Sequence, residues 1–220
     1  MKEVRVRDLF VAILKRDVKL MFSNRQQVTH TLLFFVISIT ILRIANEQSV
    51  ISISSALGFS AIMLLFSLIL INQNLLNDEY KNDFISQYIL TGVGLEIVII
   101  AKWLAYMITI IVPVMLAVPI GVYMLCNEIM NFELFCAVSV FSANSSLILL
   151  CTASLLPDYK KFLILVIATL PFHIPNIVFL LLICQNYQYI WASASLFLFY
   201  FPVCIILSNL STKFIVRLSQ

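Results

Sequence analysis

The chain has 220 residues, of which 62% are apolar and 11% are charged, and its formal net charge is +3. A soluble domain is roughly 45–50% apolar with about 25% charged residues, so this composition excludes a water-soluble fold and predicts an all-α membrane protein. The four glycines form neither a dinucleotide-binding fingerprint nor a glycine-lysine phosphate loop, which argues against a nucleotide site in the chain itself.

The first segment, residues 3–22, has a mixed composition with apolar residues at helical spacing. Val6 and Phe10 fall on one side, while basic residues such as Lys15 fall away from it; Asp17 interrupts the apolar stripe. This pattern predicts an amphipathic helix lying in the inner membrane interface, with its basic face toward anionic headgroups. The alternative is an ordinary basic tail that only sets the topology.

The rest of the chain is expected to form six membrane-spanning helices within a single transmembrane domain, residues 1–220. Each is long enough for a hydrocarbon core of about 30 Å. Backbone groups must be satisfied inside each span, because lipid offers them no partners. The third span is overlong and carries Pro113 and Pro119, which predicts a kink. The spans cover residues 28–45, 50–72, 97–125, 132–156, 161–184 and 188–210.

The basic residues predict which way the protein faces. Of 14 lysines and arginines, only Arg43 lies on the side opposite to the N-terminus when the six spans alternate. Lysine and arginine accumulate on the cytoplasmic side of membrane proteins. We therefore expect both termini and residues 77–92 to face the cytoplasm, or the matrix if the membrane is mitochondrial.

Residues 77–92, NDEYKNDFISQYILTG, form a compact charged and aromatic segment between the second and third spans. In a helix, its aromatic side chains lie on one face and its acidic groups on the remainder. We interpret it as a helix that docks into another protein; the alternative is a short interfacial helix without a partner. The predicted contacts are the aromatic anchors Tyr80, Phe84 and Tyr88 and the acidic rim Asp78, Glu79 and Asp83.

Three stretches carry a resemblance to a known family. They are RDLFVAILKRDVKLMFSNR; LLNDEYKNDFISQYIL followed by AKWLAYMITIIVPVMLAVPIGVYML; and ILVIATLPFHIPNIVF, which keeps a double-proline pattern at Pro171 and Pro175. With them the chain closely resembles haem exporter protein B, the membrane subunit of the cytochrome c maturation system and a permease of the type-2 ABC exporter class. It departs from the family at Gln73-Asn74, where members often have a Glu-Arg pair.

The resemblance implies a bacterial inner-membrane permease that works with a separate ATP-binding subunit, next to a haem-handling membrane protein and a small single-span protein. ATP hydrolysis in such a complex serves release of a haem-loaded chaperone. Residues 77–92 would be the coupling helix, and a homodimer within the complex is one arrangement. The chain itself would be no enzyme and would bind no cofactor directly, since partners handle haem and ATP; nucleic acid is not a partner. The competing hypothesis is a non-transporting scaffold that assembles cytochrome c maturation factors.

Several residues inside the predicted spans have two interpretations. His30 and His173 could ligate haem iron, but a neutral histidine within the bundle is the preferred interpretation. Residues 144–146 (Asn-Ser-Ser) and Asn176 are expected to hydrogen-bond between helices; lining a substrate path is the alternative.

The remaining reactive or charged residues point to no catalytic or metal site. The five cysteines are expected to pack as small apolar residues, with a disulfide among Cys126, Cys136 and Cys184 as the alternative. Glu96 and Lys102 lie near the predicted cytosolic end, where Lys102 can snorkel. The spans thus hold almost no charge at mid-depth, which disfavours a proton-driven carrier.

Overall fold

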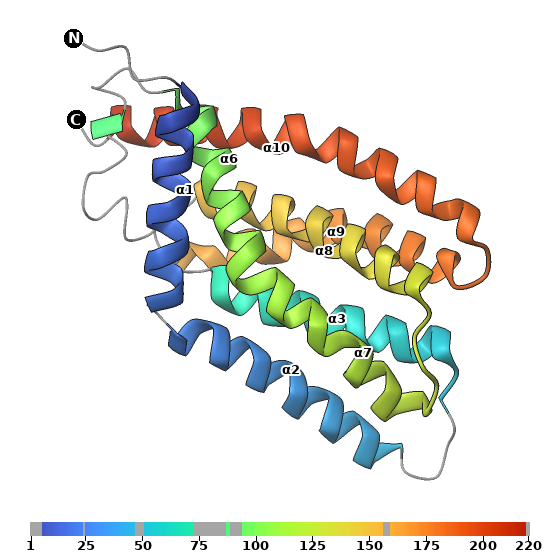
Figure 1. Cartoon of the computed structure of the whole chain (residues 1–220). Helices are drawn as coiled ribbons and strands as arrows, with labels where there is room; N and C mark the ends of the chain where they lie inside the picture. The colour runs from blue at the N-terminus through green and yellow to red at the C-terminus, as the bar shows by residue number, and fades with distance from the viewer. Residues whose placement is uncertain are drawn as a thin grey trace.

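The computed structural model describes residues 6–23, 25–46, 51–72, 87–88, 94–155 and 159–218, and these contain helices but no β-strand. Successive long helices run in opposite directions, so the C-terminal ends of α2, α7 and α9 lie at one end of the bundle (Figure 1). The start of α1 and the end of α10 lie at the other end. The elements are α1 Val6–Ser23, α2 Arg25–Ala45, α3 Ile53–Asn72, α6 Leu95–Tyr106, the π-helical turn η1 Met107–Ile111, α7 Val112–Cys126, α8 Phe132–Leu155, α9 Tyr159–Ile183, the 3-10 turn η2 Tyr187–Tyr189 and α10 Ile190–Leu218.

Among the described residues, five helical stretches are long and apolar enough to cross a membrane, and each overlaps a predicted span. The sixth predicted span, 161–184, covers most of α9 and one residue beyond it. Within α9, Thr169–Ile183 forms a shorter apolar helix, so a sixth crossing stays a prediction. The five stretches are Val28–Ala45, Ile53–Leu70, Leu95–Cys126, Phe132–Ser154 and Tyr187–Phe214.

The third predicted span is one continuous helical stretch that changes direction at η1 (Figure 1). Pro113, the second residue after η1, has no N–H to donate to the carbonyl oxygen of Thr109. The backbone widens here into a π-helical turn, in which the N–H of Val112 bonds to the carbonyl oxygen of Met107. The predicted kink is therefore present, and it lies in the turn preceding the proline.

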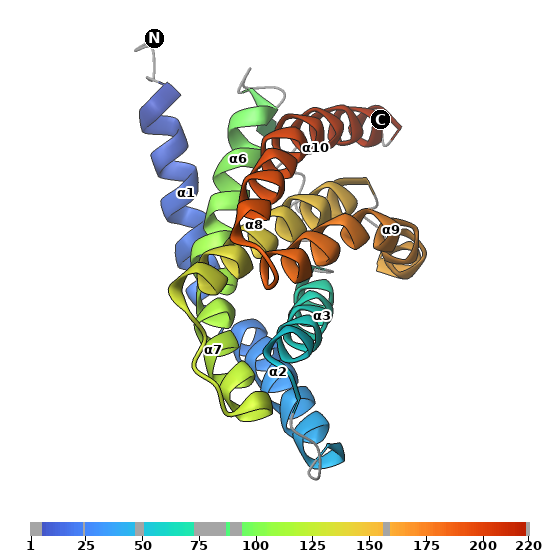
Figure 2. The ribbon, with the colours of Figure 1, turned by 90° about the vertical axis from the view of Figure 1, so that its right-hand side faces the viewer.

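The helix α8 is the centre of the bundle. It packs against α3, α9 and α10, and 72% of its candidate span is buried, against 17% for α2. Figure 2, which looks along the bundle, shows α8, α9 and α10 grouped together, with α2 and α7 beyond α3. The outer faces of α2 and α10 carry large exposed apolar side chains, as expected of helices that face lipid or another membrane protein.

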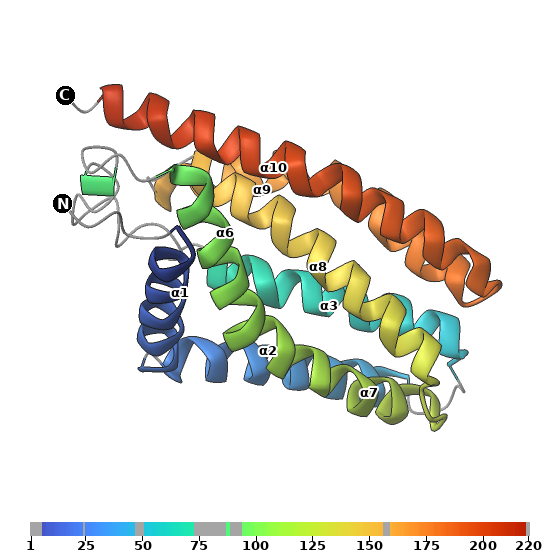
Figure 3. The same cartoon turned by 45° about the horizontal axis from the view of Figure 1, so that its top comes forward.

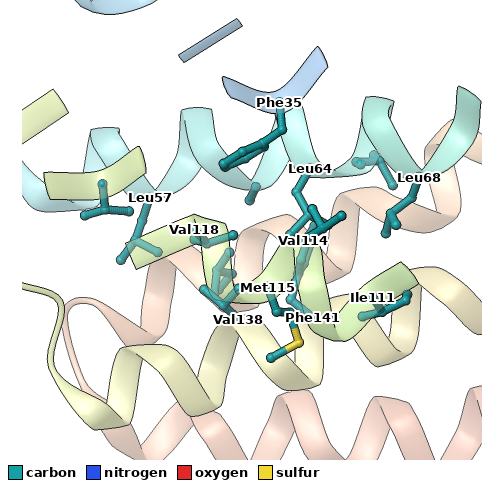
Figure 4. Close-up of a cluster of buried hydrophobic side chains, with 14 of the residues drawn as sticks. Phe35, Leu57, Leu64, Leu68, Ile111, Val114, Met115, Val118, Val138 and Phe141 are labelled. Atoms are coloured by element: carbon teal, nitrogen blue, oxygen red, sulfur yellow. The ribbon is translucent and has the colours of Figure 1, made fainter. Parts of the chain in front are cut away.

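The main core lies where α2, α3, α7 and α8 meet. Figure 4 shows Phe35 of α2 directed toward α3 and α7, with Leu64 and Val114 beneath it. Gly121 permits this close approach of α2, because a Cβ atom there would lie 3.3 Å from two ring atoms of Phe35. A small residue at a crossing of membrane helices lets their backbones come close.

The predicted N-terminal helix 3–22 corresponds to α1. Figures 1 and 3 show α1 beside α6 at one end of the bundle, running at a steep angle to α2. Its apolar side chains Leu9, Phe10 and Ile13 pack with Val98 and Ala101 of α6. The stripe expected to face the membrane interface is thus partly used against α6, and the interfacial position of α1 stays a prediction.

Candidate functional site

The segment expected to dock a partner enters the described structure only at its end. Asp78, Glu79, Tyr80, Asp83 and Phe84 lie outside the described residues, whereas Gln87 and Tyr88 are described and helical. Tyr88 is half-buried and packs against two apolar clusters, one shared by α1 and α6 and the other by α6, α8 and α10. The segment therefore joins the bundle at Tyr88.

Arg16 of α1 makes the polar contact to Tyr88. Its Nη1 donates a hydrogen bond of 2.6 Å to the phenolic oxygen, and its Cζ lies 5.9 Å from the centroid of the ring. This distance is within the range of a cation–π interaction. One guanidinium thus holds Tyr88 by both its hydroxyl and its ring, and fixes the end of the segment to α1.

Asp17 links this contact to the third span. Arg16 approaches one carboxylate oxygen, with Nη2 at 2.7 Å and Nε at 2.8 Å from Oδ1. Lys102 of α6 approaches the other, with Nζ at 3.6 Å from Oδ2. Only 3% of the Asp17 side chain is exposed. A carboxylate this deeply buried requires paired cations, and here it has one from each helix. We call Arg16, Asp17, Tyr88 and Lys102 the charged junction.

The charged junction corrects one interpretation and explains another. Lys102 is buried rather than snorkelling to the membrane surface, because Asp17 supplies its counterion. Asp17 breaks the apolar stripe of α1 because it faces α6. A second polar contact lies nearby on the other side of α6, where Asn209 of α10 donates a hydrogen bond to Glu96.

Polar side chains in the interior bond between helices. Asn144 of α8 donates from Nδ2 to Oδ1 of Asn176 on α9 at 3.2 Å and to the carbonyl oxygen of Ser193 on α10 at 3.3 Å. The expected interhelical role of these two amides is confirmed. Ser146 accepts a hydrogen bond of 2.9 Å from the indole N–H of Trp103, whereas Ser145 Oγ has no partner among the described residues.

The histidines and cysteines differ in their surroundings. His173 is buried, and neither ring nitrogen has a hydrogen-bond partner among the described residues, while His30 is exposed on α2. The described part of the chain contains no cluster of three metal-ligating side chains. All five cysteines are free, and Cys126, Cys151 and Cys204 are buried among apolar side chains, which agrees with a packing role.

Sequence reasoning missed two parts of this arrangement. It did not pair Asp17 with Lys102, although each is a charge next to apolar residues, which is a signal that both need a partner. It also assigned no structural role to Trp103, whereas the ring packs with Phe197 and Phe201 and anchors α6 to α8 and α10.

In a comparison with protein families, the model described as CcmB protein matches residues 8–212. This range includes most of α1, the whole charged junction and most of α10. No curated protein matches the chain.

Proposed function

The chain belongs to the CcmB protein family, a membrane component of the haem exporter of cytochrome c maturation, and we propose that it couples ATP hydrolysis on a separate subunit to a rearrangement of its own helices. Residues 77–92 would be the part that docks onto that subunit. The chain would supply no ATP site and bind neither haem nor ATP itself.

The observation that carries this proposal is the attachment of the docking segment at Tyr88. Within the segment, the side chain of Tyr88 is held by α1 and packed against α6, so a force applied to residues 77–92 from outside reaches two helices of the bundle.

The partners follow from the family and from this geometry. The docking segment would bind the ATP-binding subunit. The lipid-facing sides of α2 and α10 would be available to the haem-handling membrane protein, to the small single-span protein or to a second copy of this chain. We propose the bacterial inner membrane as the location, with both termini in the cytoplasm, because Lys and Arg concentrate on that side.

Co-purification from detergent tests the docking role. A central aromatic anchor contributes about 2 kcal/mol or more, so Phe84→Ala should weaken binding of the ATP-binding subunit about 30-fold. Asp83→Asn should cost under about 1 kcal/mol and act mainly through the salt dependence of binding. Tyr187→Ala is a matched control, because Tyr187 is an exposed aromatic residue in η2 at the opposite end of the bundle.

Two results would contradict the proposal. One is full retention of the ATP-binding subunit by a Tyr80→Ala, Phe84→Ala double variant present at normal abundance, which would place the docking surface elsewhere. The other is cytochrome c maturation that persists when the ATP-binding subunit cannot hydrolyse ATP, which would favour the non-transporting scaffold.

A further inference from the structure

We propose that the charged junction transmits movement of the docking segment to the third span. Arg16, Asp17 and Lys102 act as positioning residues, and Tyr88 connects them to the segment. This inference rests on the proposed function, since it assigns a role within the coupling step. It also gives Tyr88 a role inside the chain, distinct from that of an anchor in the partner.

The contacts form one unbroken series across three parts of the chain. The phenolic oxygen of Tyr88 is 2.6 Å from Arg16 Nη1, Arg16 Nη2 is 2.7 Å from Asp17 Oδ1, and Asp17 Oδ2 is 3.6 Å from Lys102 Nζ. The series starts in the docking segment, passes through α1 and ends in α6. A displacement of Tyr88 therefore acts on α6 through polar contacts as well as through packing.

Burial makes the Asp17 link hard to break. The side chains of Asp17 and Lys102 are 3% and 6% exposed, and separating this pair takes each charge away from a close counterion in a medium that solvates charge poorly. When the docking segment moves, it therefore costs less for α1 and α6 to move together than for the pair to open. Leu9, Phe10 and Ile13 pack against α6 beside the pair and reinforce this joint motion.

The C-terminal end of α6, shortly after Lys102, provides a place where the motion can be absorbed. α6 is followed by η1, whose π-helical hydrogen bonds replace the regular α-helical ones before Pro113. Such turns are weak points in a helix and recur at functional sites. In this arrangement the charged junction moves α6 together with α1 at Lys102. η1, which begins five residues later, is the hinge that separates this movement from α7.

The test separates docking from coupling by measuring each in the assembled complex. Asp17→Asn and Lys102→Met each remove one charge of the pair, and Tyr88→Phe removes only the hydroxyl while keeping the ring. We expect all three to retain the ATP-binding subunit in co-purification. Because coupling free energies between sites commonly correspond to 5–150-fold effects, Asp17→Asn and Lys102→Met should lower ATP turnover per retained subunit by about fivefold or more, with a smaller loss for Tyr88→Phe.

Two further variants keep the result interpretable. The double variant Asp17→Asn, Lys102→Met removes both charges, so it should be more abundant in the membrane than either single variant and still be uncoupled. Tyr123→Phe is the control for loss of a tyrosine hydroxyl, because Tyr123 is exposed on α7, and it should behave as the unaltered chain.

The outcomes distinguish the two proposals. Unchanged ATP turnover per retained subunit in the double variant would overturn the coupling role and leave the charged junction purely structural. Loss of the ATP-binding subunit from Tyr88→Phe would also overturn it, since Tyr88 would then be an anchor in the partner. If the unaltered chain does not retain an ATP-binding subunit at all, the proposed function fails, and with it the premise of this inference.

Discussion

Gly121 lies where α2 crosses α7, and replacing it with alanine should destabilise the bundle, whereas the same change at Gly58 should not. A Cβ atom at residue 121 would lie 3.3 Å from Cε1 and Cζ of Phe35 and 3.5 Å from Cγ1 of Ile39. Both neighbours are 1% exposed, and the aromatic ring is rigid, so neither can move aside. A Cβ atom at residue 58 would meet only Cδ2 of Leu181, at 3.2 Å, which is the tip of a flexible side chain.

The comparison of the two variants isolates the packing term. Each glycine lies within a helix, so the gain in helix propensity, about 1 kcal/mol for alanine over glycine, appears in both and cancels. What remains is the cost of overpacking at residue 121, about 1–3 kcal/mol. The free energy of unfolding of Gly121→Ala should therefore be lower than that of Gly58→Ala by about 1–3 kcal/mol, and its unfolding midpoint should lie at a lower SDS fraction.

Unfolding in mixed micelles with increasing SDS, followed by far-UV circular dichroism, measures the difference. The unaltered chain and both variants are compared at equal detergent concentration. An equal midpoint for Gly121→Ala and Gly58→Ala would refute the reasoning, because it would show that Phe35 can yield and that α2 is not held tightly against α7.

Three further predictions concern other parts of the molecule. Trp103→Phe should cost about 1 kcal/mol in the same unfolding assay through loss of the bond to Ser146, while Trp103→Ala should cost about 3–5 kcal/mol; equal costs would mean that the ring packing contributes nothing. His173→Ala should leave cytochrome c maturation largely intact at normal protein abundance. If this variant lost both maturation and a haem absorbance band, His173 would instead be a haem ligand. Fusions to alkaline phosphatase, which is active only in the periplasm, test the orientation. Fusions after Lys81, Lys160 or Gln220 should be inactive, and those near Glu47, Glu128 or Asn186 should be active. An active fusion at Lys81 would show that the predicted orientation is wrong.

Hydropathy predicts where the helices are because lipid imposes their length and requires a helical backbone. The prediction 132–156 corresponds to α8, Phe132–Leu155, and 97–125 to the stretch Leu95–Cys126. The largest difference is at the end of α10, which continues to Leu218 rather than ending at 210. The apolar sequence ends near residue 210, whereas the helix continues, and hydropathy detects only the apolar sequence.

The neighbours of each helix could not be predicted in the same way. Every span is apolar nearly all round, so its sequence does not state which face meets which partner. The pairing of Asp17 with Lys102, 85 positions apart in the sequence, depends on α1 lying beside α6. Pro113 and the polar residues of α8 were the exceptions, because a missing N–H and a buried amide each require a particular local solution.

The polar character of α8 has a consequence for how the protein is made. Asn144 bonds to Asn176 and to the backbone of Ser193, which follow it by 32 and 49 positions. At about 5–20 residues per second, α8 waits roughly 2–10 s after Asn144 is synthesised before Ser193 exists. During that time the amide of Asn144 lacks at least one of its two partners on α9 and α10. A nascent chain that ends before α9 and α10 therefore exposes polar groups to lipid, and membrane quality-control proteases can recognise it by them.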